Sequence, residues 1–579
     1  MPTVNVNRDL LFEKLGQSYS DEEFDELCFQ FGIELDDVTT DSNDPKGAVT
    51  YKIDIPANRY DLLCLEGLSR ALLVFTKKIQ APVYRAVKPG SLIKTVVKAS
   101  TKNVRPYVVT AVLRDVTLSQ SAYDSLIDLQ EKLHHNICRK RSLVAIGVHD
   151  LDTLSPPFVY SADPPQEINF LPLNQKKSFR GDELMIHYQS DNHIKHYLHL
   201  IKDEPLFPVI RDSKGVVLSL PPIINGNHSR VSMGTKNLYF ECTATDLTKA
   251  TIVLDILITM LSEHCNTKFE AELTEVIYED QDSPCYFPAL KYRKEIVKPE
   301  LVNSVIGINL TPEQMALSLD RMCLKSRVEQ STEASLEVEV PPTRHDVIHA
   351  ADIIEDVAIA FGYDNIPKTL PATNTIASQV PLNKLTDQLR NSIAQAGFTE
   401  ALTFSLCSVE DECEKVRHSR DIKEPQLARV ANPKTLEFQA ARHSLLSGLL
   451  KTLQANKKMP LPLKLFEISD VVLLDSSVDT GSRNERRLCA VFYNKSPGFE
   501  IIHGLLDRIM LLLEVPCSEA GGYSIRSAED PTYFEGRCAV VLYNSKVIGR
   551  LGVLHPEVLS NFELSMPCSA IEIAIEDFV

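Results

Sequence analysis

Four acidic residues are the clearest set of side chains in this sequence that could bind a cation: Asp346, Asp352, Glu355 and Asp356. The last three are spaced i, i+3 and i+4, which places them on one face of a predicted helix, and Asp346 is expected near its N-terminus. Carboxylates on one face repel one another unless a positive group lies among them, and Mg²⁺ prefers oxygen ligands. The alternatives are pairing with Arg344 and a solvated acidic face.

Two histidine-containing segments are weaker candidates. His193, His196 and His199 recur every three residues, but this spacing drifts around a helix, so exposed polar histidines explain it better than a zinc site. His149 follows an apolar predicted strand at 143–148, and strand ends often carry catalytic or ligand-binding residues. A turn stabilised by the neighbouring aspartates accounts for this segment equally well.

Two basic clusters could contact phosphates, namely residues 139–141 (Arg-Lys-Arg) and Lys176 and Lys177 with Arg180. A solvated charged loop is the ordinary explanation of either cluster alone. The sequence has no GxxxxGK[ST], GxGxxG, GxSxG or HExxH motif. It therefore carries no self-sufficient signature of a nucleotide hydrolase or a serine hydrolase.

The acidic set belongs to the second of two related segments, 54–62 and 339–347. Both segments have the same order of residue types. An acid, a branched apolar residue, Pro and two small residues are followed by Arg, an aromatic residue or His, Asp and an apolar residue. Each is preceded by a helix with a predicted capping box, at 20–23 and at 311–314, and followed by an apolar helix. We infer two related modules with the order helix, strand, loop, helix.

The two predicted modules differ in their acidic residues. In the first module the apolar helix is predicted at 62–75, and in the second at 347–361. The positions that match the second module's three helix acids are Gly67, Arg70 and Ala71 in the first. Only Asp61 remains there, so the acidic cluster can form in the second module alone.

Composition limits the class of protein. A length of 579 residues implies about three to five domains, and 44% hydrophobic with 24% charged residues excludes a long disordered chain. The net charge of −17 argues against a basic nucleic-acid coat but leaves room for local basic patches. Thirteen cysteines without a CxxC pair predict free, mostly buried thiols in a reducing compartment, the cytoplasm. No signal peptide and no membrane-spanning segment is expected.

Several motifs spread over the chain resemble those of one family. They are residues 21–29 (DEEFDELCF), 105–109 (RPYVV), 145–152 (AIGVHDLD), 221–226 (PPIING), 432–433 (NP) with Glu437, 442–446 (RHSLL), 465–469 (LFEIS) and 552–556 (GVLHP). On these motifs the chain resembles the β subunits of phenylalanyl-tRNA synthetases of the archaeal and eukaryotic cytosolic type. The resemblance covers nearly the whole length.

The resemblance implies an (αβ)₂ heterotetramer that joins phenylalanine to tRNA(Phe) with ATP and Mg²⁺, with the ATP site on the α subunit. It implies an α+β multidomain fold: an N-terminal module (1–85), an editing domain of the B3/B4 type (86–275), a winged-helix-like Mg²⁺-binding module (290–370) related to the first, and a catalytically inactive class II synthetase-like antiparallel-sheet domain (375–579). No GxGxxxR motif occurs, in line with an inactive domain. Glu437 and Arg442 are then remnants of that fold that support packing against α.

The resemblance also implies two kinds of site residue. Asp346, Asp352, Glu355 and Asp356 match the family's Mg²⁺ pattern position by position, with Asp356 replacing a bacterial Glu, and the metal's role would be structural. The editing domain would hydrolyse tRNA(Phe) mischarged with tyrosine, because an apolar pocket cannot strongly reject one extra hydroxyl. The editing residues would be Asp246 first and then Glu241, with His149 and Asn225 as weaker candidates.

Two other functions remain open at this point. One is a non-enzymatic tRNA-binding scaffold with an inactive editing pocket. The other is a stand-alone Mg²⁺-dependent hydrolase built on the acidic cluster.

Overall fold

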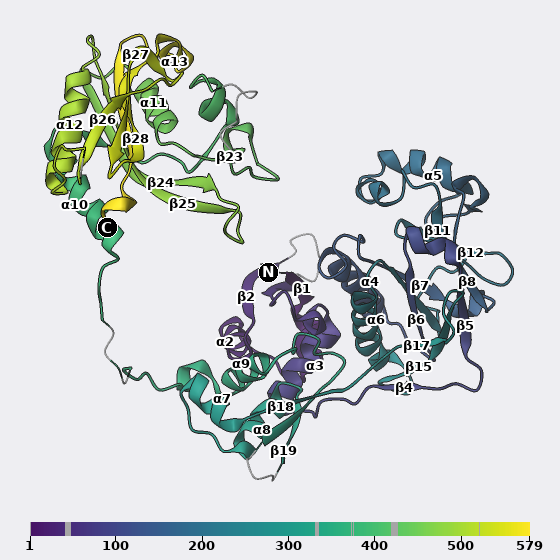
Figure 1. Ribbon diagram of the computed structural model, residues 1–579. Coiled ribbons are helices and arrows are strands. Elements are labelled where there is room, and N and C mark those ends of the chain that lie inside the picture. Colours follow the sequence, from purple (N-terminus) through teal and green to yellow (C-terminus); the bar gives the residue numbers. More distant parts are fainter. Residues whose placement is uncertain are drawn as a thin grey trace. The chain divides into compact units, whose positions relative to one another are not determined.

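The computed structural model describes residues 2–40, 48–329, 335–371, 373, 376–418, 427–519 and 521–579. It divides into two compact units, Met1–Leu370 and Pro371–Val579 (Figure 1). Helices and sheets occur in both units, so the expected mixed α+β multidomain architecture is confirmed. All thirteen cysteines are free, as predicted, and Cys517 is the exposed one. None of the helices in the described ranges is long and apolar enough to cross a membrane.

The first module of the repeat is a three-stranded sheet covered by helices. Ser20 accepts a hydrogen bond from the Glu23 amide and Glu23 reaches back to the Ser20 amide, so the predicted capping box starts α2. The strands lie in the order β1-β3-β2. The elements are β1 (Thr3–Asn7), α1 (Arg8–Leu15), α2 (Asp21–Phe31), β2 (Glu34–Thr40), β3 (Val49–Asp54) and α3 (Leu65–Phe75).

The second module has the same succession of elements. Its strands lie in the order β18-β20-β19, which matches β1-β3-β2 strand for strand. A capping box at Thr311 and Gln314 starts α8, as predicted, with Pro312 in the first turn. The elements are β18 (Arg293–Val297), α7 (Pro299–Ile306), α8 (Pro312–Arg321), β19 (Lys325–Glu329), β20 (Ser335–Val340) and α9 (Ala350–Phe361).

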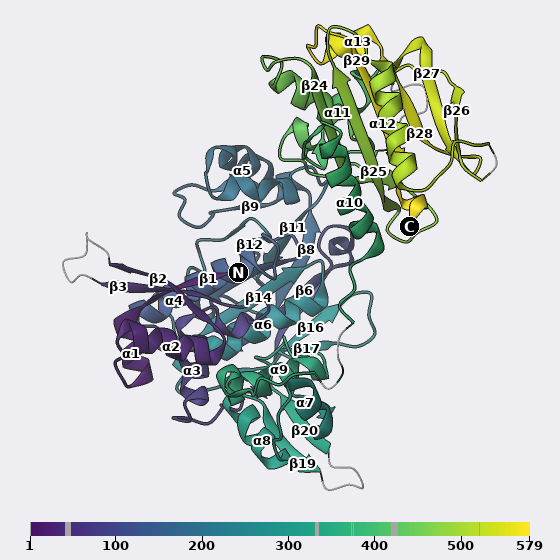
Figure 2. The same ribbon diagram turned by 90° about the vertical axis from the view of Figure 1, so that its left-hand side faces the viewer.

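The two modules pack against each other in a reciprocal way. Helix α2 of the first contacts α9 of the second, and α3 contacts α8 (Figures 1 and 2). The Arg321 guanidinium lies 4.1 Å from the centre of the Phe75 ring and donates hydrogen bonds to the Phe75 and Ala360 carbonyls. The second module keeps a hydrophobic cluster of its own, and only Met322 and Ala360, with Ile359 packed against them, join the apolar cluster of the first module.

Between the two modules the chain forms two further sheets. One has the order β4-β15-β6-β14-β7 and is covered by α4 and α6, and the other has the order β13-β12-β11-β8-β5-β16-β17 (Figure 2). A two-stranded sheet of β9 and β10 lies beside α5. The elements are β4 (Arg85–Val87), β5 (Ile93–Val97), β6 (Tyr107–Leu113), α4 (Gln120–His135), β7 (Val144–Asp150), β8 (Phe158–Asp163), β9 (Asn169–Phe170), β10 (Phe179–Arg180), α5 (Gly181–His187), β11 (Phe207–Arg211), β12 (Val217–Leu220), β13 (Ile224–Asn225), β14 (Leu238–Ala244), α6 (Leu247–Leu261), β15 (Glu270–Glu272), β16 (Thr274–Tyr278) and β17 (Cys285–Phe287).

The second unit is built on a seven-stranded sheet in the order β21-β24-β25-β29-β28-β27-β26. All its pairs are antiparallel except β21 with β24. Helices α10 and α12 contribute to one apolar cluster, and α11 and α13 to another. The elements are α10 (Pro381–Gln395), β21 (Thr399–Glu400), β22 (Leu406–Cys407), β23 (Ala440–Ala441), α11 (Leu446–Ala455), β24 (Leu463–Leu474), β25 (Ser482–Tyr493), α12 (Phe499–Leu512), β26 (Tyr523–Ser527), β27 (Tyr533–Tyr543), β28 (Lys546–Leu554), α13 (Pro556–Asn561) and β29 (Cys568–Ala574).

Candidate functional site

A cavity of about 210 Å³ lies where the β7–β14 pair meets β12, β13 and α4. Glu241 from β14 and Ser219 from β12 line it and are almost completely buried. Asn225 and Arg141 line it as half-exposed residues. The cavity is therefore lined by a carboxylate that is almost completely buried and by a guanidinium whose residue is only partly buried.

Glu241 is the buried acid of this cavity, with 2% of the residue exposed. Its Oε1 accepts a hydrogen bond of 2.7 Å from the Ser219 hydroxyl. His149 Nε2 is 3.7 Å from the same oxygen, too far for a hydrogen bond. Across the described residues, nothing donates to Oε2. A buried carboxylate oxygen without a donor is costly, and it is ready to accept one from a ligand.

Gly147 makes room for the Glu241 side chain. It lies directly opposite Glu241 in the β7–β14 pairing. A Cβ at Gly147 would stand 2.2 Å from Glu241 Oε1, a distance that no real pair of atoms can hold. A glycine inside a strand often marks such a close approach, which is the sequence signal that could have pointed to this residue. Gly147 and Ser219 are the two site residues that our sequence analysis missed.

The other predicted editing residues lie at different depths. Asn225 lines the cavity. His149 is completely buried beside Glu241, where its Nδ1 contacts the Ser229 hydroxyl at 2.8 Å and its Nε2 has no partner in the described structure. Asp246 lies outside the residues that line the cavity. It is the N-cap of α6 and accepts a hydrogen bond of 3.0 Å from the Lys249 amide, which lowers its pKa.

The acidic set of the second module is organised around Arg344 in this structure. The Arg344 Nη2 atom lies 2.7 Å from an Asp346 oxygen and 2.6 Å from an Asp356 oxygen, and all three side chains are buried. Burial alone would raise the pKa of Asp346, but Arg344 and Arg59 lower it. The corresponding pair in the first module, Arg59 and Asp61, has the same geometry at 2.8 Å.

The remaining two acids of the set face elsewhere. Asp352 Oδ2 accepts hydrogen bonds of 2.8 Å from the Ile348 and His349 amides at the start of α9, and Glu355 is exposed. In the described ranges, no three of the four predicted ligands bring carboxylate oxygens within 4.8 Å of one another. The arrangement shown is thus an arginine-bridged acid pair, Asp346 and Asp356, with Asp352 and Glu355 outside it.

The structure does bring one other group of potential metal ligands together. Glu66, Glu263 and His264 offer atoms within 4.8 Å of one another. Lys14 and Arg70 already pair with Glu263. Burial would raise the pKa of Glu66, but hydrogen bonds from His264 and Ser125 lower it to about 2. The charges of this group are therefore balanced by protein cations.

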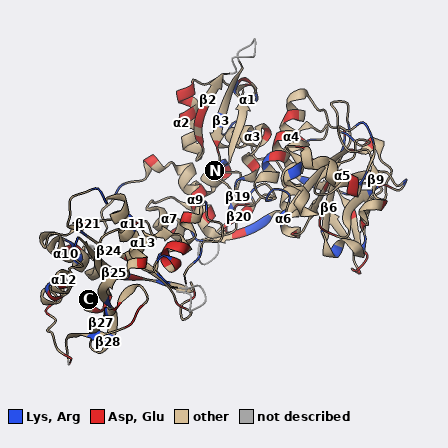
Figure 3. Cartoon of the chain, turned by 90° about the horizontal axis from the view of Figure 1, so that it is seen from above, with Lys and Arg blue, Asp and Glu red and all other residues tan. Residues whose placement is uncertain are grey.

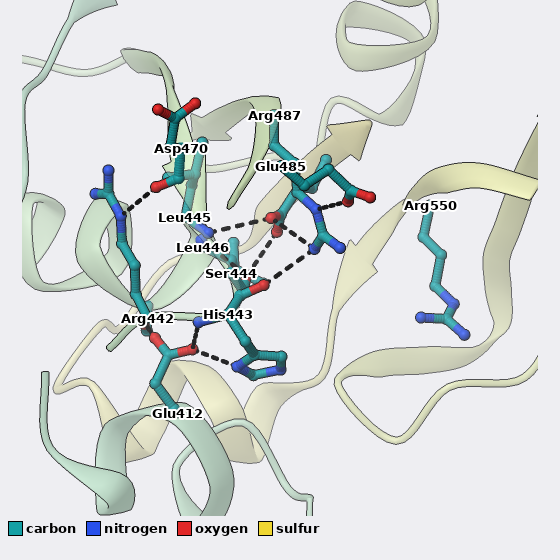
Figure 4. Close-up of polar contacts among 12 residues, drawn as sticks. Glu412, Arg442, His443, Ser444, Leu445, Leu446, Asp470, Glu485, Arg487 and Arg550 are labelled. Atoms are coloured by element: carbon teal, nitrogen blue, oxygen red, sulfur yellow. Dashed lines mark hydrogen bonds and ion pairs between the residues drawn. The ribbon is translucent and has the colours of Figure 1, made fainter. Parts of the chain in front are cut away.

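In the second unit, Arg442 belongs to a polar network, and Figure 4 draws its hydrogen bond to the Asp470 carbonyl and the nearby contact of Glu412 with His443. Arg442 Nη1 lies 2.8 Å from Glu467 Oε1, and Arg442 Nε donates to the Asp470 carbonyl. Nearby, Glu412 contacts His443 Nδ1 at 2.6 Å. Glu437 is exposed and pairs with Lys451. These contacts are of a structural kind.

Models of known domain families and curated proteins both match this chain along its length. The models that match are described as the Phe-tRNA synthetase beta subunit B1 domain (residues 1–78), the B3/4 domain (94–266), the tRNA synthetase B5 domain (296–363) and the phenylalanyl tRNA synthetase beta chain CLM domain (366–575). The chain is 58% identical to the mouse and 57% identical to the human phenylalanine–tRNA ligase beta subunit, covering 100% of each chain. It belongs to the phenylalanine–tRNA ligase β-subunit family.

Other members of the β-subunit family support this assignment. The cytoplasmic beta subunit of Arabidopsis thaliana is 47% identical over 100% of both chains. The crystal structure of an N-terminal fragment of the Pyrococcus horikoshii phenylalanyl-tRNA synthetase beta subunit is 31% identical, with a TM-score of 0.57, over 62% of this chain and 99% of that one. Within the family's domain scheme, the cavity with Glu241 lies in the B3/4 match, and Arg344 with its acids lies in the B5 match.

Proposed function

We propose that this chain works with an α subunit in an (αβ)₂ heterotetramer that attaches phenylalanine to tRNA(Phe), and that its own cavity hydrolyses mischarged Tyr-tRNA(Phe). Family membership over the full length supports the first part. The second part rests on one observation: Glu241 lines a cavity, and its buried Oε2 has no donor among the described residues. ATP would bind to the α subunit.

The open oxygen of Glu241 explains how the cavity could select tyrosine. The tyrosyl hydroxyl is a donor and can supply the missing hydrogen bond, whereas a phenylalanyl ring would leave Oε2 desolvated and unpaired. Sites that hydrogen-bond a hydroxyl can reject the analogue lacking it by as much as roughly 10⁴–10⁵. The correct product, Phe-tRNA(Phe), would therefore escape hydrolysis.

The reaction itself is ester hydrolysis. A water molecule adds to the carbonyl carbon of the tyrosyl ester, the bond from that carbon to the ribose oxygen breaks, and the ribose oxygen takes a proton. The products are tyrosine and tRNA with a free terminal hydroxyl. Holding the hydroxyl on Glu241 fixes the ester relative to the half-exposed end of the cavity, where water enters, and such positioning is a main source of rate.

The test compares Glu241→Gln with wild type in the αβ complex, using Tyr-tRNA(Phe) as substrate. We expect deacylation to fall roughly 100-fold, about 2.7 kcal/mol in the barrier, while phenylalanine attachment is unchanged. Gly147→Ala should have a similar effect because it displaces the Glu241 side chain without changing it. The control is Glu272→Gln, since Glu272 pairs with Arg114 outside the cavity.

Either of two results would reject this proposal. A wild-type complex that fails to deacylate Tyr-tRNA(Phe) favours the scaffold with an inactive pocket. Deacylation that is as fast in Glu241→Gln as in wild type shows that the reaction takes place elsewhere.

We also propose, as a separate prediction, that the acids of the second module, Asp346, Asp352, Glu355 and Asp356, bind Mg²⁺. Its test is the melting temperature of the complex with and without Mg²⁺, because a ligand that binds only the folded state raises it. The double variant Asp352→Asn with Glu355→Gln leaves the Arg344 pairs in place and should abolish the increase. If the increase is the same in wild type and the variant, these two acids do not bind the ion.

A further inference from the structure

We infer that the basic residues around the opening of the Glu241 cavity bind the backbone phosphates of the single-stranded RNA end that carries the ester. We call these residues the cationic rim, and they are Arg139, Lys140, Arg141, Lys176 and Lys177. The inference rests on the proposed function and adds to it how the polynucleotide part of the substrate is held.

The first part of the cationic rim is the turn between α4 and β7. Arg139, Lys140 and Arg141 have φ angles of 44°, 53° and 64°, three successive left-handed residues that are not glycine. The Lys140 amide donates to the His134 carbonyl at 2.7 Å, and the Ser142 hydroxyl donates to the Arg139 carbonyl at 2.7 Å, so the turn is fixed. Strained backbone of this kind persists where the surroundings hold it, often at binding sites.

The side chains of this turn are available to a ligand. Arg139 and Lys140 are exposed, and neither forms an ion pair within the described ranges. Arg141 lines the cavity, and its guanidinium donates to the Pro222 and Ile223 carbonyls while it stacks 4.2 Å from the centre of the Tyr197 ring. These contacts place the guanidinium but do not neutralise it. Glu131 also lines the cavity, and its negative charge acts on the Arg141 guanidinium.

The second part of the cationic rim comes from a distant stretch of sequence. Leu173 lines the same cavity, and its amide donates to the Asn225 carbonyl at 2.9 Å. The chain then runs into the loop that carries Lys176 and Lys177, both exposed. Lys177 lies 4.6 Å from the centre of the Phe179 ring. Leu173 precedes Lys176 and Lys177 by only three and four residues, so the second basic cluster begins next to a residue that lines the cavity.

The charge distribution of the cavity matches a ligand with two different ends. The buried carboxylate accepts a neutral donor such as a phenol, and unneutralised cations at the opening attract an anion. Five acidic residues of the chain lie on α2 of the first module (Figure 3). Free tyrosine would need no cationic rim, whereas an aminoacyl ester of RNA brings phosphates next to the opening.

The experiment measures kcat and KM for Tyr-tRNA(Phe) deacylation by the αβ complex with Arg139→Asn and Lys140→Asn combined. Asparagine removes both charges and tolerates the left-handed backbone, so the turn is kept. We expect KM to rise about tenfold with kcat within about twofold. The slope of log(kcat/KM) against log salt should fall by about 1.4, or about 0.7 for each lost phosphate contact on a single strand.

Two further variants make the result decisive. Lys176→Ala tests the second part of the cationic rim and should raise KM without affecting the turn. The control, Lys88→Ala with Lys268→Ala, removes two exposed charges beside β4 and β15, at the opposite edge of the sheet from β7, and should leave KM and the salt slope unchanged.

The outcomes separate this inference from the proposed function. Glu241→Gln should lower kcat/KM for deacylation but leave its salt slope unchanged, because the phosphate contacts remain; if deacylation is unaffected, the proposed function fails. If Glu241→Gln behaves so but the Arg139 and Lys140 variant keeps the wild-type KM and salt slope, the cationic rim does not bind phosphates. A fall in kcat alone in that variant also overturns the inference, since it would mean that the cavity was distorted.

Discussion

Two buried glutamates, one in each unit, show opposite uses of the same side chain. Glu467 in β24 is completely buried, and Arg442 Nη1 and the Thr403 hydroxyl donate to its two oxygens, each at 2.8 Å. Glu241 in β14 is buried to nearly the same degree. The Ser219 hydroxyl donates a hydrogen bond to one of its oxygens, but none of the described residues donates to the other. Both oxygens of Glu467 are hydrogen-bonded within its own fold, whereas Glu241, which lines a cavity, has one acceptor oxygen without a donor in the described structure.

This difference separates a structural acid from a binding acid. A saturated buried ion pair holds its surroundings together, and removing one partner leaves an uncompensated charge. An unsaturated acid contributes little to folding, but it can give a large and selective gain to a ligand that supplies the missing donor. Burial and charge alone would have ranked the two glutamates equally.

The largest expected effect is on the saturated acid. Arg442→Ala should destabilise the second unit by about 3–5 kcal/mol, because Glu467 is left buried without its cation. Hydrogen exchange of the β24 amides in the full chain measures this directly. The matched control is Arg483→Ala, whose partly exposed pairs with Asp475 and Glu485 should cost no more than about 1 kcal/mol. If the β24 amides exchange at the same rate in both variants, the buried Arg442–Glu467 pair stabilises the unit no more than the exposed pairs of Arg483 do.

A third buried acid, Asp255 in α6, forms no ion pair with any of the described residues. Burial raises its pKa to about 7, against a hydrogen bond from the Leu290 amide. The folded state then holds a proton that the unfolded chain releases near pH 4. Stability should therefore fall as the pH rises from about 4 to about 7, by about 1.4 kcal/mol for each pH unit.

Asp255→Asn should remove this pH dependence, because the amide cannot ionise. Urea unfolding or hydrogen exchange of α6 at pH 5 and pH 7 measures the change. Asp124→Asn, at an exposed position of α4, serves as the control and should keep the wild-type dependence. A wild-type chain that becomes more stable between pH 5 and pH 7 in this region would show that Asp255 is ionised throughout.

The smallest effect is expected at Asp246, which caps α6 and does not line the cavity. Asp246→Ala should cost about 1 kcal/mol of stability through the lost N-cap and should change Tyr-tRNA(Phe) deacylation by no more than a few-fold. Asp246→Asn is the matched control because asparagine caps equally well. A 100-fold loss of deacylation in both variants would instead give Asp246 the role that we assign to Glu241.

The sequence predicted the modules better than the cavity. Capping boxes at Ser20 and Thr311 and the shared Pro-Arg-Asp loop are local signals, so they located the helices and loops of both modules. Glu241 gave no such signal because every residue of β14 is buried, and the strand lacks the alternation that shows which way a side chain points. Gly147 comes from the neighbouring strand β7 and Ser219 from β12 of the other sheet, and only folding brings them together.

The acids of the second module show the same limit. Sequence spacing placed Asp352, Glu355 and Asp356 on one helical face and named Arg344 as a competing partner. It could not tell which acids Arg344 would contact, because that depends on the loop that carries Asp346 back over α9. In the structure Arg344 forms ion pairs with Asp346 and Asp356, and Glu355 is exposed to solvent.

The reciprocal packing of α2 on α9 and α3 on α8 also has a consequence during synthesis of the chain. Asp346 follows Asp61 by 285 residues (61 to 346), so the second module leaves the ribosome long after the first. At roughly 5–20 residues per second, the delay is about 15–60 s. For that time the Phe75 face of α3 lacks the Arg321 side chain that covers it. Nascent chains that end before α9 should therefore be the forms that need protection from aggregation.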